Sequence, residues 1–444
     1  MKLSRRHFLK TSAVVSATTL STSTFASALT SPNAARSSEN ANKALVCVFL
    51  FGGNDAYNMI VPTPGCDAYQ DYKAARPKMG LPETQLSPLN LTTTNGVPLS
   101  INNNMSSLLP LFEAGNATAI INSGQLIQPT TRDDISNDQV KLPQFLMAHN
   151  QQQDLWQLGT ENLGNAYGWA GRMMDMLGAT GSLSPLISIS QGQKLLRNKK
   201  AQQTVVNGKG AGKYSAWNDE ERLDGYFAHF TQRQYSNIYM RNYASAMSRN
   251  LSENEAIKTI LAKHPSHDTY PALDLAEQLN MVSRLIKARD DMHQQRQVFF
   301  VGLEGFDTHK DQQNIHPQLL KQVSDALSAF NADMVDSGLN DQVTCVTMSD
   351  FGRRLQANAS GTDHGWAGHQ IITGGAVRSN EIYGEWPQLT VNSQHNYNNG
   401  RIIPTIAADQ VNASLCRWLG LPTAQILSIF PNLTNFDSPY IEFI

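Results

Sequence analysis

The strongest structural signal in the sequence is LVCVFLFGGND, residues 45–55. Its unbroken apolar run has the length of one β-strand, which indicates a strand that is buried on both faces, as in a parallel sheet. The run ends in Gly52-Gly53-Asn54-Asp55, a combination typical of a turn. We therefore predict a central strand over 44–51 with a carboxylate, Asp55, directly after it.

Apolar runs of strand length alternate with helical patterns along the rest of the chain. This alternation predicts an α/β fold with a doubly wound, mostly parallel sheet. Region 191–295 differs, because its long helical patterns have no strand between them, and we interpret it as a helical insertion or cap. Predicted strands cover 118–121, 185–190, 297–303, 343–348 and 370–373, and predicted helices cover 106–113, 145–158, 169–177, 236–263, 272–293, 318–337 and 407–419.

The N-terminus carries an export signal rather than part of the fold. Residues 4–10, SRRHFLK, form a twin-arginine motif, and Ala26-Ser27-Ala28 fits an A-x-A cleavage site. We expect a signal peptide over 1–28, a flexible polar leader over 29–42 and one large domain over 43–444. The twin-arginine machinery exports folded chains, so we expect a periplasmic or secreted protein without a membrane span.

Composition excludes several classes of partner and cofactor. The formal net charge of the 444 residues is −2, which gives no electrostatic reason to expect nucleic acid as a partner. Cys47 and Cys345 fall in predicted core strands and are expected to be buried thiols, whereas a disulfide that involves Cys66 stays open. The turn after the first strand lacks the G-x-G-x-x-G pattern of dinucleotide-binding proteins.

Acidic residues and histidines follow three predicted strands. The carboxyl ends of parallel strands share one edge of a sheet, where ligands bind in open α/β folds. Carboxylates that gather there repel one another unless a cation lies between them. Mixed carboxylate and imidazole ligands suit zinc, manganese or iron, and carboxylates alone suit magnesium or calcium. The predicted divalent-metal ligands are Asp55, Asp307, His309, Asp350, Asp363 and His364.

Each of these residues also has a purely structural interpretation. Asp55 could cap a turn, and the carboxylate of Asp307 could cap a helix. Asp350 could cap the next helix or pair with Arg353. The glycines on both sides of Asp363-His364 favour a functional interpretation, because glycine permits a close approach of the backbone to a ligand.

Five longer motifs occur along the chain: VFLFGGNDAYNMIVP, AHNQQQDLWQLG, GFDTH, SDFGRR and GTDHGWAGHQIITGGAV. Together they resemble a family of commonly twin-arginine-exported proteins catalogued as domain of unknown function 1501. The resemblance covers about 44–440, nearly the whole mature chain.

That family looks like a branch of the alkaline phosphatase and sulfatase superfamily, which implies a doubly wound sheet that binds one or two divalent metals. The resemblance matches Asp55, Asp307, His309, Asp350 and His364 to metal ligands. Phe351 stands where relatives have a histidine beside the third acidic ligand. Candidates for the hydroxyl nucleophile of the relatives are Thr130, Thr131 and Ser123, and Ala148 stands where the family has a serine.

These features favour a metal-dependent hydrolase of phosphate or sulfate esters, with zinc, manganese or magnesium as the cofactor. In this interpretation Arg353 stabilises charge on the transferred group, while His149 and Asn150 orient the substrate or a water molecule. The alternative is a non-catalytic, metal-containing binding or assembly protein of the periplasm. Phe351 and Ala148 favour that alternative.

Overall fold

The structure is a computed structural model that describes residues 42–179, 181–200, 202–208 and 220–444. The expected signal peptide and leader lie outside these residues, except for Asn42. Within the described ranges, no helix combines the length and the apolar character that a membrane crossing needs.

An eight-stranded sheet forms the centre of the fold, in the order β15-β5-β12-β9-β1-β8-β6-β7. β1 lies between β8 and β9 and runs parallel to both, whereas β12 is antiparallel to its neighbours β9 and β5. The prediction of a mostly parallel α/β sheet is therefore confirmed. The strands are β1 (Lys43–Leu50), β5 (Ala117–Gly124), β6 (Leu186–Ser188), β7 (Thr204–Val205), β8 (Arg296–Leu303), β9 (Val343–Ser349), β12 (Gly368–Thr373) and β15 (Ile406–Ala407).

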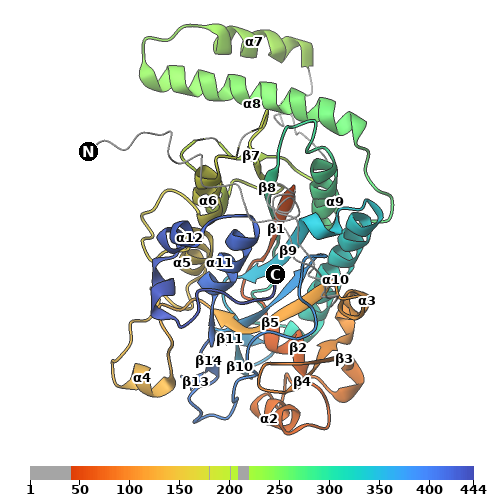
Figure 1. The fold of residues 1–444 in the computed structure, drawn as a ribbon, viewed down its shortest axis with the longest axis vertical. Coiled ribbons are helices and arrows are strands. Elements are labelled where there is room, and N and C mark those ends of the chain that lie inside the picture. Colours follow the sequence, from red (N-terminus) through yellow and green to blue (C-terminus); the bar gives the residue numbers. More distant parts are fainter. Residues whose placement is uncertain (1–41, 180, 201, 209–219) are drawn as a thin grey trace, which may run out of the picture. The chain divides into compact units, whose positions relative to one another are not determined.

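Helices cover both faces of this sheet, because both faces of β1 are apolar. Alternate residues of a strand point to opposite faces. Val46 and Val48 pack into one hydrophobic cluster with α9 and α10, while Cys47 and Phe49 pack into another with helices of the opposite face (Figure 1). The helices are α9 (Asp274–Lys287) and α10 (Gln312–Asp336) on the first face, and α5 (His149–Leu158), α6 (Trp169–Leu177), α11 (Ala408–Trp418) and α12 (Thr423–Ile429) on the second.

The region predicted as a helical insertion has two parts. α7 (Glu220–Gln232) and α8 (Ile238–Lys263) pack against each other as a pair, seen beyond one end of the sheet in Figure 1. α9 instead packs on the sheet and supplies buried residues to its core. Region 191–295 also contains β7, a short strand that the sequence analysis did not predict.

Several small elements surround the sheet, and all of them except α3, which lies in the predicted helix 106–113, were not predicted. A three-stranded sheet in the order β2-β4-β3 follows β1 in the sequence, and a hairpin of β10 and β11 follows β9. The remaining elements are β2 (Ile60–Pro62), α2 (Asp67–Ala75), β3 (Leu86–Thr92), β4 (Pro98–Asn102), α3 (Leu109–Glu113), α4 (Arg132–Ser136), β10 (Arg353–Ala357), β11 (Thr362–His364), β13 (Asn396–Tyr397) and β14 (Arg401–Ile402).

The cysteines behave as the sequence indicated. Cys47 and Cys345 are buried in neighbouring strands, and both are free thiols. Cys66 is also free, so the structure contains no disulfide that involves it.

Two glycines bring the loops after the strands close together. Gly52 follows β1 with φ of +113°, and a Cβ atom there would lie 2.3 Å from the backbone nitrogen of Asp307. A Cβ atom at Gly361 would lie 2.1 Å from the carbonyl oxygen of Thr308. The loop after β8 is thus held between the end of β1 and the β10–β11 hairpin. The glycines around Asp363-His364 therefore permit close packing of the protein backbone on itself.

Candidate metal centre

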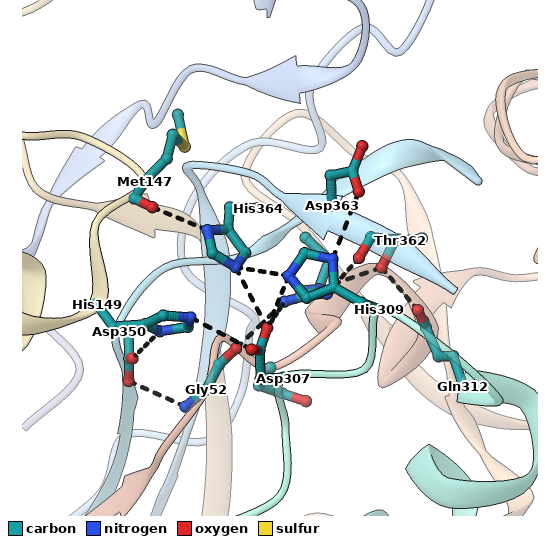
Figure 2. A network of polar contacts seen from close by, with 12 residues as sticks. Gly52, Met147, His149, Asp307, His309, Gln312, Asp350, Thr362, Asp363 and His364 are labelled. Carbon is teal, nitrogen blue, oxygen red and sulfur yellow. Dashed lines mark hydrogen bonds and ion pairs between the residues drawn. The ribbon is translucent and has the colours of Figure 1, made fainter. Parts of the chain in front are cut away.

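Three histidines and one aspartate converge beyond the carboxyl ends of β1, β8 and β9 (Figure 2). Asp307 follows β8, His149 begins α5, and His364 ends β11. One potential ligand atom from each of these three residues lies within 4.8 Å of the other two. Segments far apart in the sequence thus meet at the edge where open α/β folds bind ligands.

The Nδ1 atom of each imidazole faces an acceptor outside the cluster. His149 Nδ1 lies 2.6 Å from Asp350 Oδ2, and His364 Nδ1 lies 2.8 Å from the carbonyl oxygen of Met147. His309 Nδ1 faces Asp363 Oδ1 at 3.4 Å. A carbonyl oxygen only accepts hydrogen bonds, so Nδ1 of His364 carries the proton and its Nε2 atom has a free lone pair.

The Nε2 atoms face one another and Asp307. His309 Nε2 lies 2.9 Å from His364 Nε2, and both lie close to Asp307 Oδ1, at 3.1 and 3.2 Å. His149 Nε2 is buried without a hydrogen-bond partner and lies 3.6 Å from Asp307 Oδ2. Atoms that face each other this closely either share a proton, as in a hydrogen bond between the two Nε2 atoms, or bind one metal ion.

This donor set fits a divalent transition metal. Imidazole nitrogen with one carboxylate suits zinc or manganese better than magnesium, which prefers oxygen ligands. Histidines that bind metals usually hold their other ring nitrogen on a carboxylate or a backbone carbonyl, as all three do here. His149, Asp307 and His364 form the closest group, and His309 borders it.

Asp350 lies behind the cluster, which differs from the expectation that it binds the metal. Its side chain is fully buried and accepts hydrogen bonds from the Gly52 backbone, from Gln153 and from His149. The Trp156 indole also donates to its backbone oxygen at 3.0 Å. These contacts occupy both carboxylate oxygens, so Asp350 orients His149.

The expectation that Asp55 joins the ligands is not met by this geometry. Arg76 binds its two carboxylate oxygens at 2.7 and 2.6 Å, and Gln312 donates to one of them. The Asp55 and Arg76 side chains are both fully buried. Burial alone would raise the pKa of Asp55, but the charge and hydrogen bonds of Arg76 outweigh it and hold this pKa below its usual range. A protein cation already compensates this carboxylate.

Asp363 borders the cluster from outside. Its carboxylate faces His309 Nδ1 and accepts a hydrogen bond from Asn358 at 3.1 Å, with Arg354 3.4 Å away. The Asn358 hydrogen bond is the largest contribution to the lowered pKa of Asp363. Asp363 thus orients His309, in the way that Asp350 orients His149.

Arg353 lies beneath Asp307 rather than facing a substrate. Its fully buried guanidinium binds Asp307 Oδ1 at 2.9 Å and the Gly52 carbonyl oxygen at 3.2 Å, and it also contacts Thr362. Partial burial would raise the pKa of Asp307, but the Arg353 hydrogen bond and charge, with His309 and His149, lower it. Direct stabilisation of a transferred group by Arg353, as the sequence suggested, does not fit this burial.

The remaining predicted residues lie away from the cluster. Asn150 follows His149 in α5 and is exposed to solvent. The three hydroxyl candidates are all engaged elsewhere: Ser123 with Gln370, Thr130 with the Gln128 carbonyl, and Thr131 as the N-cap of α4.

Phe351 packs against two of the imidazoles. Its ring centroid lies 4.8 Å from that of His149 and 4.6 Å from that of His364. Where the family resemblance suggested a missing ligand, the structure thus has an aromatic wall that restricts both histidine rings.

Backbone strain precedes His149. Phe145 and Met147 both have positive φ values, 52° and 70°, which residues with side chains rarely adopt. The Met147 carbonyl accepts the hydrogen bond from His364 Nδ1, and α5 begins two residues later at His149. This strained turn therefore brings His149 and His364 close to each other. Such strain often marks functional sites.

A cavity of about 470 Å³ opens beside the cluster. His149 and Asp307 line one end, and Gln153 of α5 and residues after β1, β6 and β8 line the rest. Asp307 is 46% exposed and His309 is 39% exposed, so a molecule in the cavity can reach the cluster from solvent.

Comparisons with known proteins add distant structural similarities. They include the C-terminal periplasmic domain of EcEptC from Escherichia coli in complex with Zn (10% identity, 87% of this chain and 84% of that chain, TM-score 0.38). The PsFucS1 sulfatase from Pseudoalteromonas sp. is 9% identical, over 88% of this chain and 71% of that chain, with a TM-score of 0.31. The alkaline phosphatase from the Antarctic bacterium TAB5 is 10% identical, over 88% of this chain and 99% of that chain, with a TM-score of 0.31. All three TM-scores are below 0.5, so none of these similarities bears on what the protein does. No curated protein matches.

Two family models match the sequence. A twin-arginine translocation signal matches residues 2–21, so the protein is exported by the twin-arginine pathway to the periplasm or beyond. The second model, described as a protein of unknown function (DUF1501), matches residues 42–409. This match spans most of the chain, and the protein therefore belongs to the DUF1501 family.

Proposed function

We propose that this protein is an exported, metal-dependent hydrolase of phosphate or sulfate esters. The observation that carries the proposal is the 2.9 Å approach of the His309 and His364 Nε2 atoms beside Asp307. His149 supports it, because its buried Nε2 atom has no partner and faces Asp307. A cation at this place would satisfy all four groups.

The ion would be held by His149, Asp307 and His364, with His309 as a fourth ligand. When bound, a divalent ion polarises an ester and promotes attack by water. The protein's own residues fix the ligands: Asp350 orients His149, and Arg353 fixes Asp307 from below. Preorganised ligands of this kind cost no rearrangement when the substrate arrives.

Water is the nucleophile in this proposal. Ser123, Thr130 and Thr131 are all bonded away from the cluster, which leaves none of the candidate hydroxyls in place. Water attacks phosphorus or sulfur, the bond to the ester oxygen breaks, and that oxygen leaves as an alcohol with a proton from the water. The products are the alcohol and inorganic phosphate or sulfate.

The test combines metal analysis with turnover. The full chain is purified after export, its metals are measured by mass spectrometry, and 4-nitrophenyl phosphate and 4-nitrophenyl sulfate are assayed before and after EDTA. We expect bound zinc or manganese, and turnover that EDTA abolishes and the same metal restores. Asp307→Asn should lose both metal and turnover, whereas Asp268→Asn, at an exposed position, is the matched control. A protein that binds no metal would refute the proposal.

A second candidate is a non-catalytic, metal-containing binding or assembly protein. It is favoured by Arg353, whose guanidinium contacts Asp307 but is fully buried and does not line the cavity. Metal that stays bound without turnover of either ester would support this candidate over the hydrolase.

A further inference from the structure

The cavity beside the metal centre is lined by carboxylates and lacks a lysine or arginine side chain among the described residues. Asp307 and His149 form its cluster end, and Glu304 lies among the residues that line the rest. Glu304 is exposed, and no ion pair to it occurs in the described part of the chain. A second anionic group on a substrate would therefore meet a carboxylate with no cation to balance it.

Amide side chains dominate the polar lining. Gln193 is only 8% exposed and lines the cavity, yet its side-chain amide has no hydrogen-bond partner among the described residues. Gln191 lines the same side from an exposed position. Gln153 uses its Nε2 atom on Asp350, which leaves its Oε1 atom for a ligand. The amides of Gln191 and Gln193 offer a donor and an acceptor each, and Gln153 offers an acceptor. Neutral hydroxyl groups can use both kinds of contact.

The cavity also has an aromatic wall and enough room for a small ligand. Phe51 lines it, and this ring rests on the core rings of Phe49 and Phe300. The volume of about 470 Å³ falls in the range of about 300–1,000 Å³ found for small-molecule sites. Flat apolar area next to hydrogen-bonding amides matches a sugar ring, which has apolar C–H faces and a hydroxyl rim.

From these features we infer that the alcohol part of the ester is an uncharged saccharide, so that the substrate is a sugar monosulfate or monophosphate. This inference depends on the proposed function only in that the substrate is an ester; the saccharide site is argued from the cavity itself. Gln191, Gln193 and Glu304 contact hydroxyl groups, and the ester group lies at the end of the cavity formed by Asp307 and His149. An amino alcohol would need the Glu304 carboxylate but would leave the Gln193 amide without a partner.

The first test compares four substrates by kcat/KM. They are galactose 6-sulfate, glucose 6-phosphate, glucose 1,6-bisphosphate and phosphoethanolamine, with the 4-nitrophenyl esters as the measure of chemistry alone. We expect one of the two sugar monoesters to exceed both the bisphosphate and phosphoethanolamine by about tenfold or more. The second anionic group of the bisphosphate meets the Glu304 carboxylate, and phosphoethanolamine has no hydroxyl groups for the glutamine amides. Turnover of 4-nitrophenyl esters with phosphoethanolamine preferred over both sugars would overturn the inference while the proposed function stands.

Two variants locate the effect in the cavity. Glu304→Gln should raise the ratio of bisphosphate to monophosphate turnover by about tenfold, because the repelling charge is gone. Gln193→Leu should raise KM for the sugar monoester with less effect on kcat, because it removes a binding contact. Glu255→Gln, at an exposed position of α8, is the matched control. An unchanged ratio in Glu304→Gln would contradict the charge argument.

Binding decides the inference even if no ester is hydrolysed. In that outcome the proposed function fails, and the same sugars are titrated into the protein by calorimetry. Measurable binding of galactose 6-sulfate or glucose 6-phosphate that is weakened about tenfold in Gln193→Leu would support a saccharide site. Absence of binding by both sugars would overturn it.

Discussion

The Nε2 atoms of His309 and His364 lie 2.9 Å apart, although the two residues are 55 positions apart in the sequence. The Met147 carbonyl fixes the ring of one, and Asp363 faces the ring of the other. At this distance the two Nε2 atoms either share one proton in a hydrogen bond or bind one cation.

Asp350→Asn should weaken metal binding without removing a ligand. The carboxylate that orients His149 becomes an amide, and loss of such an outer contact lowers metal affinity by about 10–100-fold. Competition with a chelator of known affinity measures the change, with Asp268→Asn as the control. A loss as complete as that in Asp307→Asn would show that Asp350 binds the ion directly.

Arg76→Met should destabilise the fold strongly. It leaves the Asp55 carboxylate buried without its partner, which costs about 3–5 kcal/mol in the free energy of unfolding. Urea unfolding measures this loss, and the double variant with Asp55→Asn should recover part of it because the unpaired charge is gone. If Arg76→Met instead binds a second metal ion at unchanged stability, Asp55 is a ligand after all.

The protein should lose stability as the pH falls from about 6.5 to about 4, the window between the ordinary histidine pKa and the folded values. Burial lowers the pKa of His316 and of His369 to about 4, so the folded protein keeps both neutral. The unfolded chain binds these protons throughout that window, so the free energy of unfolding decreases as the pH falls. Each histidine contributes about 3 kcal/mol, and the full loss is reached below about pH 4.

Urea unfolding at several pH values measures this slope. His316→Gln should flatten it, because glutamine can replace the Nε2 hydrogen bond to Asn54 Oδ1 but does not titrate. An equal slope in the variant and in the unchanged protein would show that His316 is not responsible.

Gly361→Ala should loosen the metal centre through the backbone. Its Cβ atom would lie 2.1 Å from the Thr308 carbonyl, so the β10–β11 hairpin and the loop that carries His309 would have to separate. Such crowding costs about 1–3 kcal/mol, and metal affinity should fall with it. Gly225→Ala is the control, since its Cβ atom meets open space in α7 and should leave metal affinity unchanged. Thermal unfolding and chelator competition read out both variants, and equal behaviour of the two would refute the argument.

The sequence predicts the sheet better than the ligand set. The apolar run 45–51 indicated a strand buried on both faces, and β1 lies there at the centre of the sheet. The strand ends also indicated where Asp307 and His364 would meet. The short strands of the β2-β4-β3 sheet were missed because runs of three to seven residues, with mixed exposure, carry little periodic signal.

The partners of the carboxylates decide which of them remain available to a metal. Arg76 reaches Asp55 from just after α2, and no spacing rule links the two residues. The Asp350 carboxylate is not available to a metal because it accepts hydrogen bonds from the Gly52 backbone and from Gln153. His149 belongs to the cluster itself, although the sequence suggested only contact with substrate or water. Its position at the start of α5, behind a turn of positive φ, was not visible in the polar pattern.

His149, Asp307 and His364 lie far apart in the sequence, and this separation bears on the cellular compartment in which the protein would acquire its metal ion. These residues meet only in the finished fold, and the twin-arginine pathway carries finished folds. The cytoplasm, with its tightly buffered pools, would therefore set the identity of the ion before the protein meets the less regulated supply outside. Exchange of residues 1–28 for a signal that exports unfolded chains should change the metal recovered; the same metal by both routes would show that the site itself selects it.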